Sequence, residues 1–130
     1  MTGVRVVLDT TALLAYARLR GMAVAEAVAM VEEEGGAALV GIPAACFLTA
    51  FDELEQDERQ RLTTLATSIE GVTVILPLTG ADTIEVAHLG RAMGHAVVEA
   101  RARDAYLATY DAEQARKHLP ERRVYELIDE

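Results

Sequence analysis

Residues 4–11, Val-Arg-Val-Val-Leu-Asp-Thr-Thr, decide how the start of the chain folds. The β-branched and aliphatic run at 4–8 is typical of a short buried strand. The segment at 12–20, ALLAYARLR, has the composition of a helix. Because threonine hydroxyls accept hydrogen bonds from the amides of a first helical turn, we expect Thr10 or Thr11 to cap this helix. The stretch therefore predicts a strand, an acid at its carboxyl end, and a helix.

The same alternation of strand and helix continues along the chain. Short apolar strands between helices predict a parallel sheet covered by helices on both faces. We therefore expect a three-layer α/β/α sandwich with a parallel sheet of four to five strands, in a single domain over residues 1–130. The expected helices cover 23–34, 44–54, 57–70, 79–92, 95–103 and 111–118, and the remaining expected strands cover 37–42, 72–76, 105–109 and 124–128.

Glycine and proline mark several of these boundaries. Gly35 and Gly36 are expected to end the helix over 23–34, and Gly71 to close the helix over 57–70. Pro43 suits the first position of the next helix, where no backbone donor is needed. Gly94 is expected to separate two consecutive helices.

The charge of the chain limits the classes of function it can have. It carries 12 basic and 21 acidic residues, a formal net charge of −9. A surface this acidic repels polyanions unless its cations cluster or a metal ion supplies positive charge. The charge therefore argues against an ordinary protein that coats nucleic acid through a basic surface.

Other features of the composition indicate the cellular compartment. Cys46 is the only cysteine, so intrachain disulfides and cysteine-based metal sites are excluded. The first residues lack the basic leader and cleavage site of a signal peptide, and no uncharged apolar run is long enough to span a membrane. We expect a cytoplasmic protein.

Two acids fall where strands are expected to end. Asp9 follows the first strand, and Asp111 follows the strand over 105–109. One interpretation is helix capping, because aspartate accepts hydrogen bonds from first-turn amides. The other is metal binding, since Mg²⁺ prefers oxygen ligands and the carboxyl ends of parallel strands meet at one edge of a sheet. The residues alone leave both interpretations open.

Four segments together resemble the PIN-domain family of small metal-dependent ribonucleases, which includes the VapC-type toxins of bacterial toxin–antitoxin pairs. They are VVLDTTALLAYAR at 6–18, the strand and Ile-Pro-Ala helix at 40–51, AVVEA at 96–100 and the Thr-x-Asp strand end at 109–111. The resemblance implies that Asp9 and Asp111 hold Mg²⁺ or Mn²⁺, that Thr11 and Thr109 stand beside the site, and that the metal activates water to cut RNA.

The chain departs from the family pattern at two acids. Thr49 stands where the family usually places a glutamate, and no acid occurs at 92–94, where the family has its third acid. The nearest polar residues there are His95 and Glu99, and Glu99 is the candidate third metal ligand. We expect either a VapC-type Mg²⁺-dependent endoribonuclease with a degenerate acid set, or a non-catalytic PIN-like module that dimerises or binds a partner protein.

The surface offers two candidate contact regions. The apolar stretch over 12–30 is expected either to pack in the core or to form the face used for a homodimer or for an antitoxin or other small partner protein, as the resemblance implies. Cations gather in the last 30 residues and either flank Asp111 as a contact for RNA phosphates or are ordinary surface charge. They are Arg101, Arg103, Arg116, Lys117, His118, Arg122 and Arg123.

Overall fold

A computed structural model describes residues 3–34, 38–67 and 71–129. Five parallel strands form one sheet in the order β3-β2-β1-β4-β5. The expectation of a parallel sheet of four to five strands is confirmed. The strands are β1 (Gly3–Leu8), β2 (Ala38–Pro43), β3 (Thr73–Leu76), β4 (Tyr106–Thr109) and β5 (Val124–Glu126).

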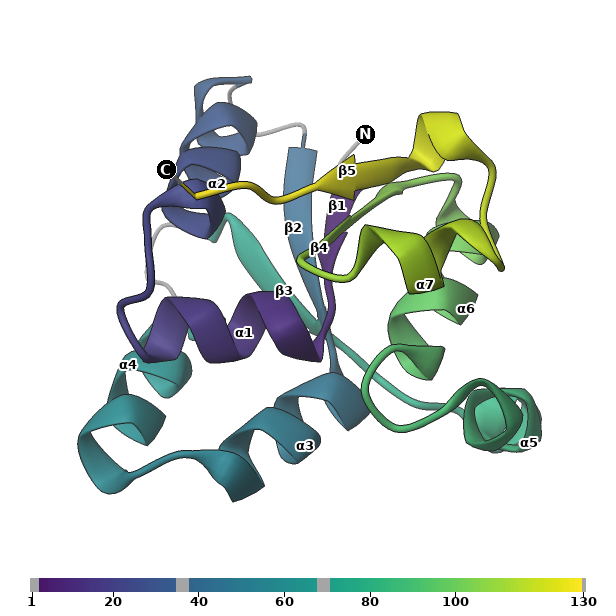
Figure 1. Cartoon of the computed structure of the whole chain (residues 1–130), viewed down its shortest axis with the longest axis horizontal. Helices are drawn as coiled ribbons and strands as arrows, with labels where there is room; N and C mark the ends of the chain where they lie inside the picture. The colour runs from purple at the N-terminus through teal and green to yellow at the C-terminus, as the bar shows by residue number, and fades with distance from the viewer. Residues whose placement is uncertain (1–2, 35–37, 68–70, 130) are drawn as a thin grey trace.

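Helices cover both faces of this sheet. Figure 1 shows α1, α2 and α4 on one side and α5, α6 and α7 on the other, with α3 beyond the end of β2. The three-layer α/β/α architecture is therefore confirmed. The helices are α1 (Thr10–Ala17), α2 (Ala23–Glu33), α3 (Ala44–Glu53), α4 (Gln56–Ala66), α5 (Gly80–Leu89), α6 (Gly94–Arg103) and α7 (Ala112–Arg116), and a 3₁₀ turn covers Glu121–Arg123.

The strand over 3–8 is the centre of the sheet. β1 pairs with β2 from Gly3 opposite Ala38 to Val7 opposite Gly41, and with β4 from Val6 opposite Tyr106 to Leu8 opposite Ala108. Because β1 and β4 are neighbours and run in the same direction, their carboxyl ends lie at one edge of the sheet. The residues that follow these strands, Asp9 and Tyr110, are therefore neighbours in space.

The core lies between the central strands and the helices beside them. Val7, Leu8, Val40, Ile42 and Leu107 have no exposed surface. These aliphatic side chains on neighbouring strands explain why β1, β2 and β4 lie at the centre of the sheet, since burial of apolar surface is the main favourable term in folding. Helix α6 is buried along residues 94–100, more than any other helix.

Several predicted boundaries were wrong, for local reasons. Asp9, not Thr10 or Thr11, caps α1, because the Asp9 carboxylate accepts from the amide of Ala12. Pro43 is the last residue of β2 and precedes α3 instead of occupying its first position. Helix α5 ends at Leu89, where Gly90 adopts a φ of 107°.

Other predicted boundaries were met or lie outside the described residues. Thr79 caps α5, as expected for the helix at 79–92. Gly94 is the first residue of α6 and follows the break between the two helices. Gly35, Gly36 and the predicted helix end at 68–70 lie outside the described residues.

Candidate functional site

Asp9 is fully buried at the carboxyl end of β1, and three hydrogen bonds hold its carboxylate. Oδ1 accepts from the Thr11 hydroxyl at 2.6 Å and from the Ala12 amide at 3.0 Å. Oδ2 accepts from the Thr109 hydroxyl at 2.6 Å. All three donors are neutral groups, so, among the described residues, the carboxylate has hydrogen-bond partners but no cationic side chain on it.

Burial raises the pKa of Asp9 above its ordinary value of 3.8, although the hydrogen bonds from Thr109, Thr11 and Ala12 act in the opposite direction. The neighbouring Asp111 carboxylate raises it further by repulsion between like charges. Asp9 and Asp111 are therefore close enough to interact electrostatically, as their strand-end positions predicted.

Thr109 links the two aspartates directly. Its hydroxyl donates to Asp9 and accepts from the Asp111 amide at 2.9 Å. In the first turn of α1, the Thr11 hydroxyl donates to Asp9 and accepts from the Tyr110 amide at 3.0 Å. The structure thus brings together Asp9, Thr11, Thr109 and Asp111, and the two threonines tie the end of β1 to the end of β4.

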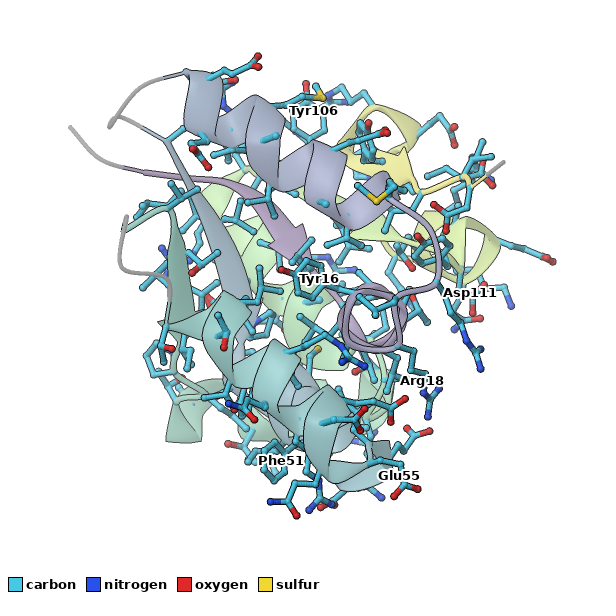
Figure 2. The ribbon with its side chains drawn as sticks, turned by 90° about the vertical axis from the view of Figure 1, so that its left-hand side faces the viewer. Tyr16, Arg18, Phe51, Glu55, Tyr106 and Asp111 are labelled. Atoms are coloured by element: carbon cyan, nitrogen blue, oxygen red, sulfur yellow. The ribbon has the colours of Figure 1, made fainter. Side chains whose placement is uncertain are left out.

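Asp111 differs from Asp9 in exposure and in the contacts of its side chain. It lies on the surface, and its Oδ1 accepts from the Gln114 amide at 3.3 Å as the N-cap of α7. The capping interpretation is therefore confirmed for Asp9, and Asp111 is in the same way the N-cap of α7. Figure 2 shows Asp111 and Arg18 on the same side of the molecule, right of the centre of the view.

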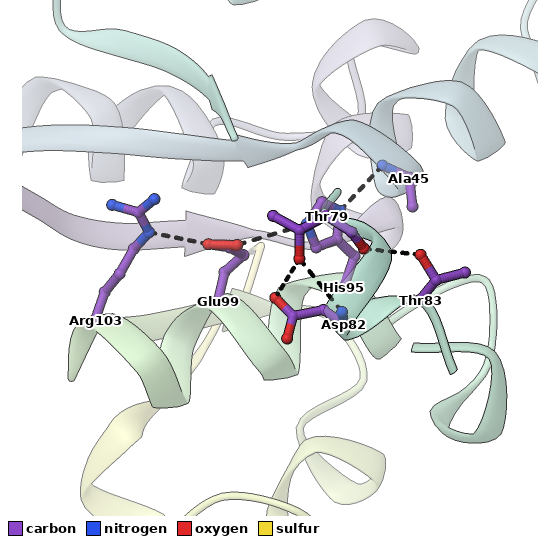
Figure 3. Close-up of polar contacts among 7 residues, drawn as sticks. All are labelled: Ala45, Thr79, Asp82, Thr83, His95, Glu99 and Arg103. Carbon is purple, nitrogen blue, oxygen red and sulfur yellow. Dashed lines mark hydrogen bonds and ion pairs between the residues drawn. The ribbon is translucent and has the colours of Figure 1, made fainter. Parts of the chain in front are cut away.

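Glu99 does not join these residues. It is buried on α6, where its Oε1 accepts from Arg103 Nε at 3.0 Å and its Oε2 lies 3.6 Å from His95 Nε2 (Figure 3). Within residues 3–34, 38–67 and 71–129, no three histidine, cysteine, aspartate or glutamate side chains lie close enough to share a metal ion. The structure thus places the candidate third ligand in a separate ion-pair cluster.

His95 is the other residue near the missing acid position, and it lies in the core. Its Nδ1 accepts from the Ala45 amide at 3.2 Å, at the start of α3 (Figure 3). Its Nε2 is buried and has no hydrogen-bond partner within the described part of the chain. Burial lowers the pKa of His95 below its ordinary value of 6.5, although Glu99 and the Pro77 carbonyl oppose this shift.

The described residues do not fit a two-metal centre. Such a centre offsets the charge of two divalent ions with several carboxylates. Here each oxygen of Asp9 already accepts a hydrogen bond, and Asp111 caps a helix. The Thr49 hydroxyl donates to the Ala45 carbonyl within α3 at 2.9 Å and carries no charge.

The predicted basic region near the C-terminal end is largely neutralised by ion pairs. Arg101 contacts Glu85, Arg103 contacts Glu99, Arg116 contacts Glu121 and Glu126, and Arg123 contacts Asp104. Paired guanidinium groups offer less positive potential to a phosphate backbone. The structure therefore supports the interpretation as surface charge for most of this set.

The apolar stretch over 12–30 contains both buried and exposed apolar side chains. Leu13 of α1 and Val24 and Ala27 of α2 are buried. Leu19, Met22 and Met30 are more than half exposed, at 69%, 65% and 55%. Core packing is therefore confirmed for the buried part of this stretch, and Leu19 and Met22, between α1 and α2, and Met30 on α2 are exposed apolar side chains. Their use as a contact face stays a prediction.

The sequence analysis did not predict a cleft that Thr11, a hydrogen-bond donor to Asp9, helps to line. It has a volume of about 370 Å³ and lies between α1 and the segment after β5, with Leu14, Arg18, Arg20, Tyr110 and Asp129 among its lining residues. The Asp129 carboxylate accepts from the Tyr110 hydroxyl at 2.6 Å and from the Ala23 amide at 3.1 Å. The sequence feature that could have indicated this cleft is the pair of arginines in ALLAYARLR, Arg18 and Arg20. Only the fold brings these arginines and Asp129 to the same cleft.

Two further observations concern Cys46 and the membrane. Cys46 is buried in α3, and burial raises the pKa of its thiol to about 12, so it is a core residue and not a nucleophile. Among the described residues, no helix has both the length and the apolar content needed to cross a lipid bilayer.

Comparison with known proteins identifies the fold. No protein-family model matches the sequence, and no curated protein matches it. Among solved structures, the chain is similar to the crystal structure of VapBC2 from Rickettsia felis bound to a DNA fragment from their promoter. That match has a TM-score of 0.65 at 11% identity and covers 96% of this chain and 99% of the other. The chain has a PIN-like fold, an α/β/α sandwich around a five-stranded parallel sheet.

Proposed function

We propose that this chain is a PIN-like module of the VapC type that acts by binding a partner protein and has lost nuclease chemistry. The observation that carries the proposal is the state of the two strand-end acids. Asp9 is buried under neutral donors, Asp111 caps α7, and within the described residues no third metal-ligating side chain joins them.

The charge of the molecule supports a protein partner over RNA. The net charge is −9, and most of the arginines in the last 30 residues are already paired with carboxylates. A ribonuclease surface attracts a polyanion with unpaired cations or metal ions. Exposed apolar side chains such as Leu19 and Met22 instead suit contact with a protein.

The structural neighbour supports a toxin–antitoxin setting for this partner. It was solved as VapBC2, bound to a DNA fragment from their promoter. By analogy, the partner of this chain is an antitoxin-type small protein. A homodimer of this chain is a further expectation, and light scattering of the purified protein measures it.

A second candidate function is a Mg²⁺- or Mn²⁺-dependent endoribonuclease, with Asp9 and Asp111 as the metal ligands and Thr11 and Thr109 beside them. One observation favours it: the Thr109 hydroxyl donates to the Asp9 carboxylate and accepts from the Asp111 backbone amide, so the two acids stand next to one another at this edge of the sheet. Such a metal ion would supply an activated water to a phosphodiester.

Calorimetry and an RNA cleavage assay decide between the two functions. We expect the wild type to take up no more Mg²⁺ or Mn²⁺ than Asp9→Asn and Asp111→Asn do, and to leave single-stranded RNA intact in either metal. Cleavage that needs the metal and disappears in Asp9→Asn would overturn the proposal. Co-expression with the product of a small neighbouring gene, followed by size-exclusion chromatography, tests the partner.

A further inference from the structure

The cleft between α1 and the segment after β5 has a lining of mixed chemistry. Leu14 and Ala15 contribute an apolar wall, Arg18 and Arg20 contribute positive charge, and Tyr110 and Asp129 lie across from them. Its volume of about 370 Å³ lies within the range of known ligand pockets. The cleft can therefore hold a few side chains of a bound molecule.

The two arginines of this cleft differ from most others in the molecule. Six arginines contact a carboxylate within 4.0 Å: Arg5, Arg61, Arg101, Arg103, Arg116 and Arg123. Within the described ranges, neither Arg18 nor Arg20 does so. Arg18 donates only to the Glu53 carbonyl at 3.3 Å. Arg59, Arg91 and Arg122 also make no such contact in the described ranges, but among the arginines only Arg18 and Arg20 line this cleft.

Asp129 is the carboxylate among the described residues that line the cleft, and both of its oxygens already accept hydrogen bonds from groups other than the arginines. Asp129 accepts from the Tyr110 hydroxyl and the Ala23 amide, and it forms no ion pair with either arginine. The guanidinium groups therefore keep their capacity to bind an added carboxylate, which arginine does with two parallel hydrogen bonds.

These observations specify the occupant by charge complementarity. We infer that the cleft binds a short acidic segment of a partner protein, with carboxylates on Arg18 and Arg20 and an apolar side chain against Leu14 and Ala15. A protein segment fits better than RNA because Leu14 and Ala15 form an aliphatic wall, which suits an apolar side chain and offers a nucleotide no polar partner. The inference rests on the proposed partner-binding function and names the chemistry of the partner.

Selection from a random short-peptide library against the full chain tests the inference. We expect the selected peptides to be enriched in aspartate and glutamate together with leucine or phenylalanine. Fluorescence anisotropy of a selected peptide should show affinity about tenfold lower for Arg18→Glu/Arg20→Glu than for the wild type. The affinity should also fall as the salt concentration rises, because the contact is ionic.

Lys117→Glu/Arg122→Glu is the matched control, because it changes the net charge equally and both side chains are exposed away from the cleft. We expect it to bind the peptide as the wild type does. Arg18 also contacts the Glu53 carbonyl, so circular dichroism must show that the double variant is folded. Arg20→Glu, which removes no described hydrogen bond, should lower affinity about threefold if the double variant unfolds.

Several outcomes would overturn the inference. These are failure to enrich any peptide, selection of basic peptides, equal loss of affinity in the control variant, or single-stranded RNA that binds through Arg18 and Arg20 in place of the acidic peptides. If peptide binding fails while RNA cleavage is still absent, the cleft assignment fails and the partner-binding function stands. If metal-dependent cleavage is found, the proposed function itself fails.

Discussion

Asp9 and Glu99 are both buried carboxylates, yet the protein holds them by different means. Asp9 accepts hydrogen bonds from two threonine hydroxyls and one amide, with no cation on it. Glu99 lies between the Arg103 guanidinium and the His95 ring. A buried carboxylate needs either a full set of donors or an opposite charge. The comparison shows that hydroxyl donors stabilise the buried carboxylate at the end of β1, whereas an ion pair stabilises the buried carboxylate on α6.

The largest expected effect is at the donors of Asp9. Thr109→Val keeps the shape of the side chain but leaves Asp9 Oδ2 without its donor and the Asp111 amide without its acceptor. We expect this change to lower the free energy of unfolding by about 3 kcal/mol, because unsatisfied buried polar groups retain their full desolvation cost. Urea unfolding followed by circular dichroism measures it.

Thr109→Ser is the control for that substitution. It retains the hydroxyl and loses only a methyl group, so we expect it to cost about 1 kcal/mol. If the valine and serine variants are equally stable, the hydroxyl does not support Asp9 and the contrast with Glu99 disappears.

The second effect is a dependence of stability on pH that comes from His95. Burial lowers its pKa in the folded protein below the ordinary value of 6.5, so the unfolded chain binds the proton more readily. The stability that neutral His95 contributes is therefore complete above about pH 6.5 and is lost as the pH falls below it. Protonation would also remove the Nδ1 acceptor of the Ala45 amide.

Urea unfolding of the wild type and of His95→Asn at pH 7 and pH 5 measures this effect. The asparagine side chain can supply an acceptor to Ala45 but does not titrate. We expect the wild type to lose more stability than the variant between the two pH values. Equal losses would show that other groups dominate the acid response.

The smallest expected effect is at the ion pair of Glu99. Arg103→Gln removes the guanidinium that contacts Glu99 Oε1. The arginine side chain is 39% exposed, so solvent screening limits the cost to about 1 kcal/mol at pH 7. Urea unfolding of the wild type and of Arg103→Gln at pH 7 measures this cost. An unchanged free energy of unfolding would show that the guanidinium does not stabilise the buried Glu99 carboxylate.

The sequence was sufficient for the architecture and for the two acids that end β1 and β4. The apolar run at 4–8 and the Thr-x-Asp end at 109–111 have local signals, since strand periodicity and strand-end acids are visible in one dimension. Parallel pairing then requires that such ends meet at one edge of the sheet. The proximity of Asp9, Thr11, Thr109 and Asp111 follows from that rule.

The sequence was not sufficient for the roles of these residues or for the charges around them. From the sequence, Asp9, Thr10 and Thr11 could each cap the helix that follows. Only the folded backbone places the Asp9 carboxylate within hydrogen-bond distance of the Ala12 amide. The sequence does not show whether the arginines of the last 30 residues are paired. The fold places carboxylates from other elements beside some of them, such as Asp104 beside Arg123.

What the sequence determined by itself is the order of strands and helices, the parallel sheet and the positions of its strand-end acids, because these depend on short-range patterns of apolar and polar residues. Only the tertiary structure decided that Glu99 belongs to His95 and Arg103, and that Arg18 and Arg20 line a cleft opposite Asp129. Those pairings join residues of different elements or depend on which side of a helix is buried. Burial and charge compensation act through space, and a linear pattern does not contain those distances.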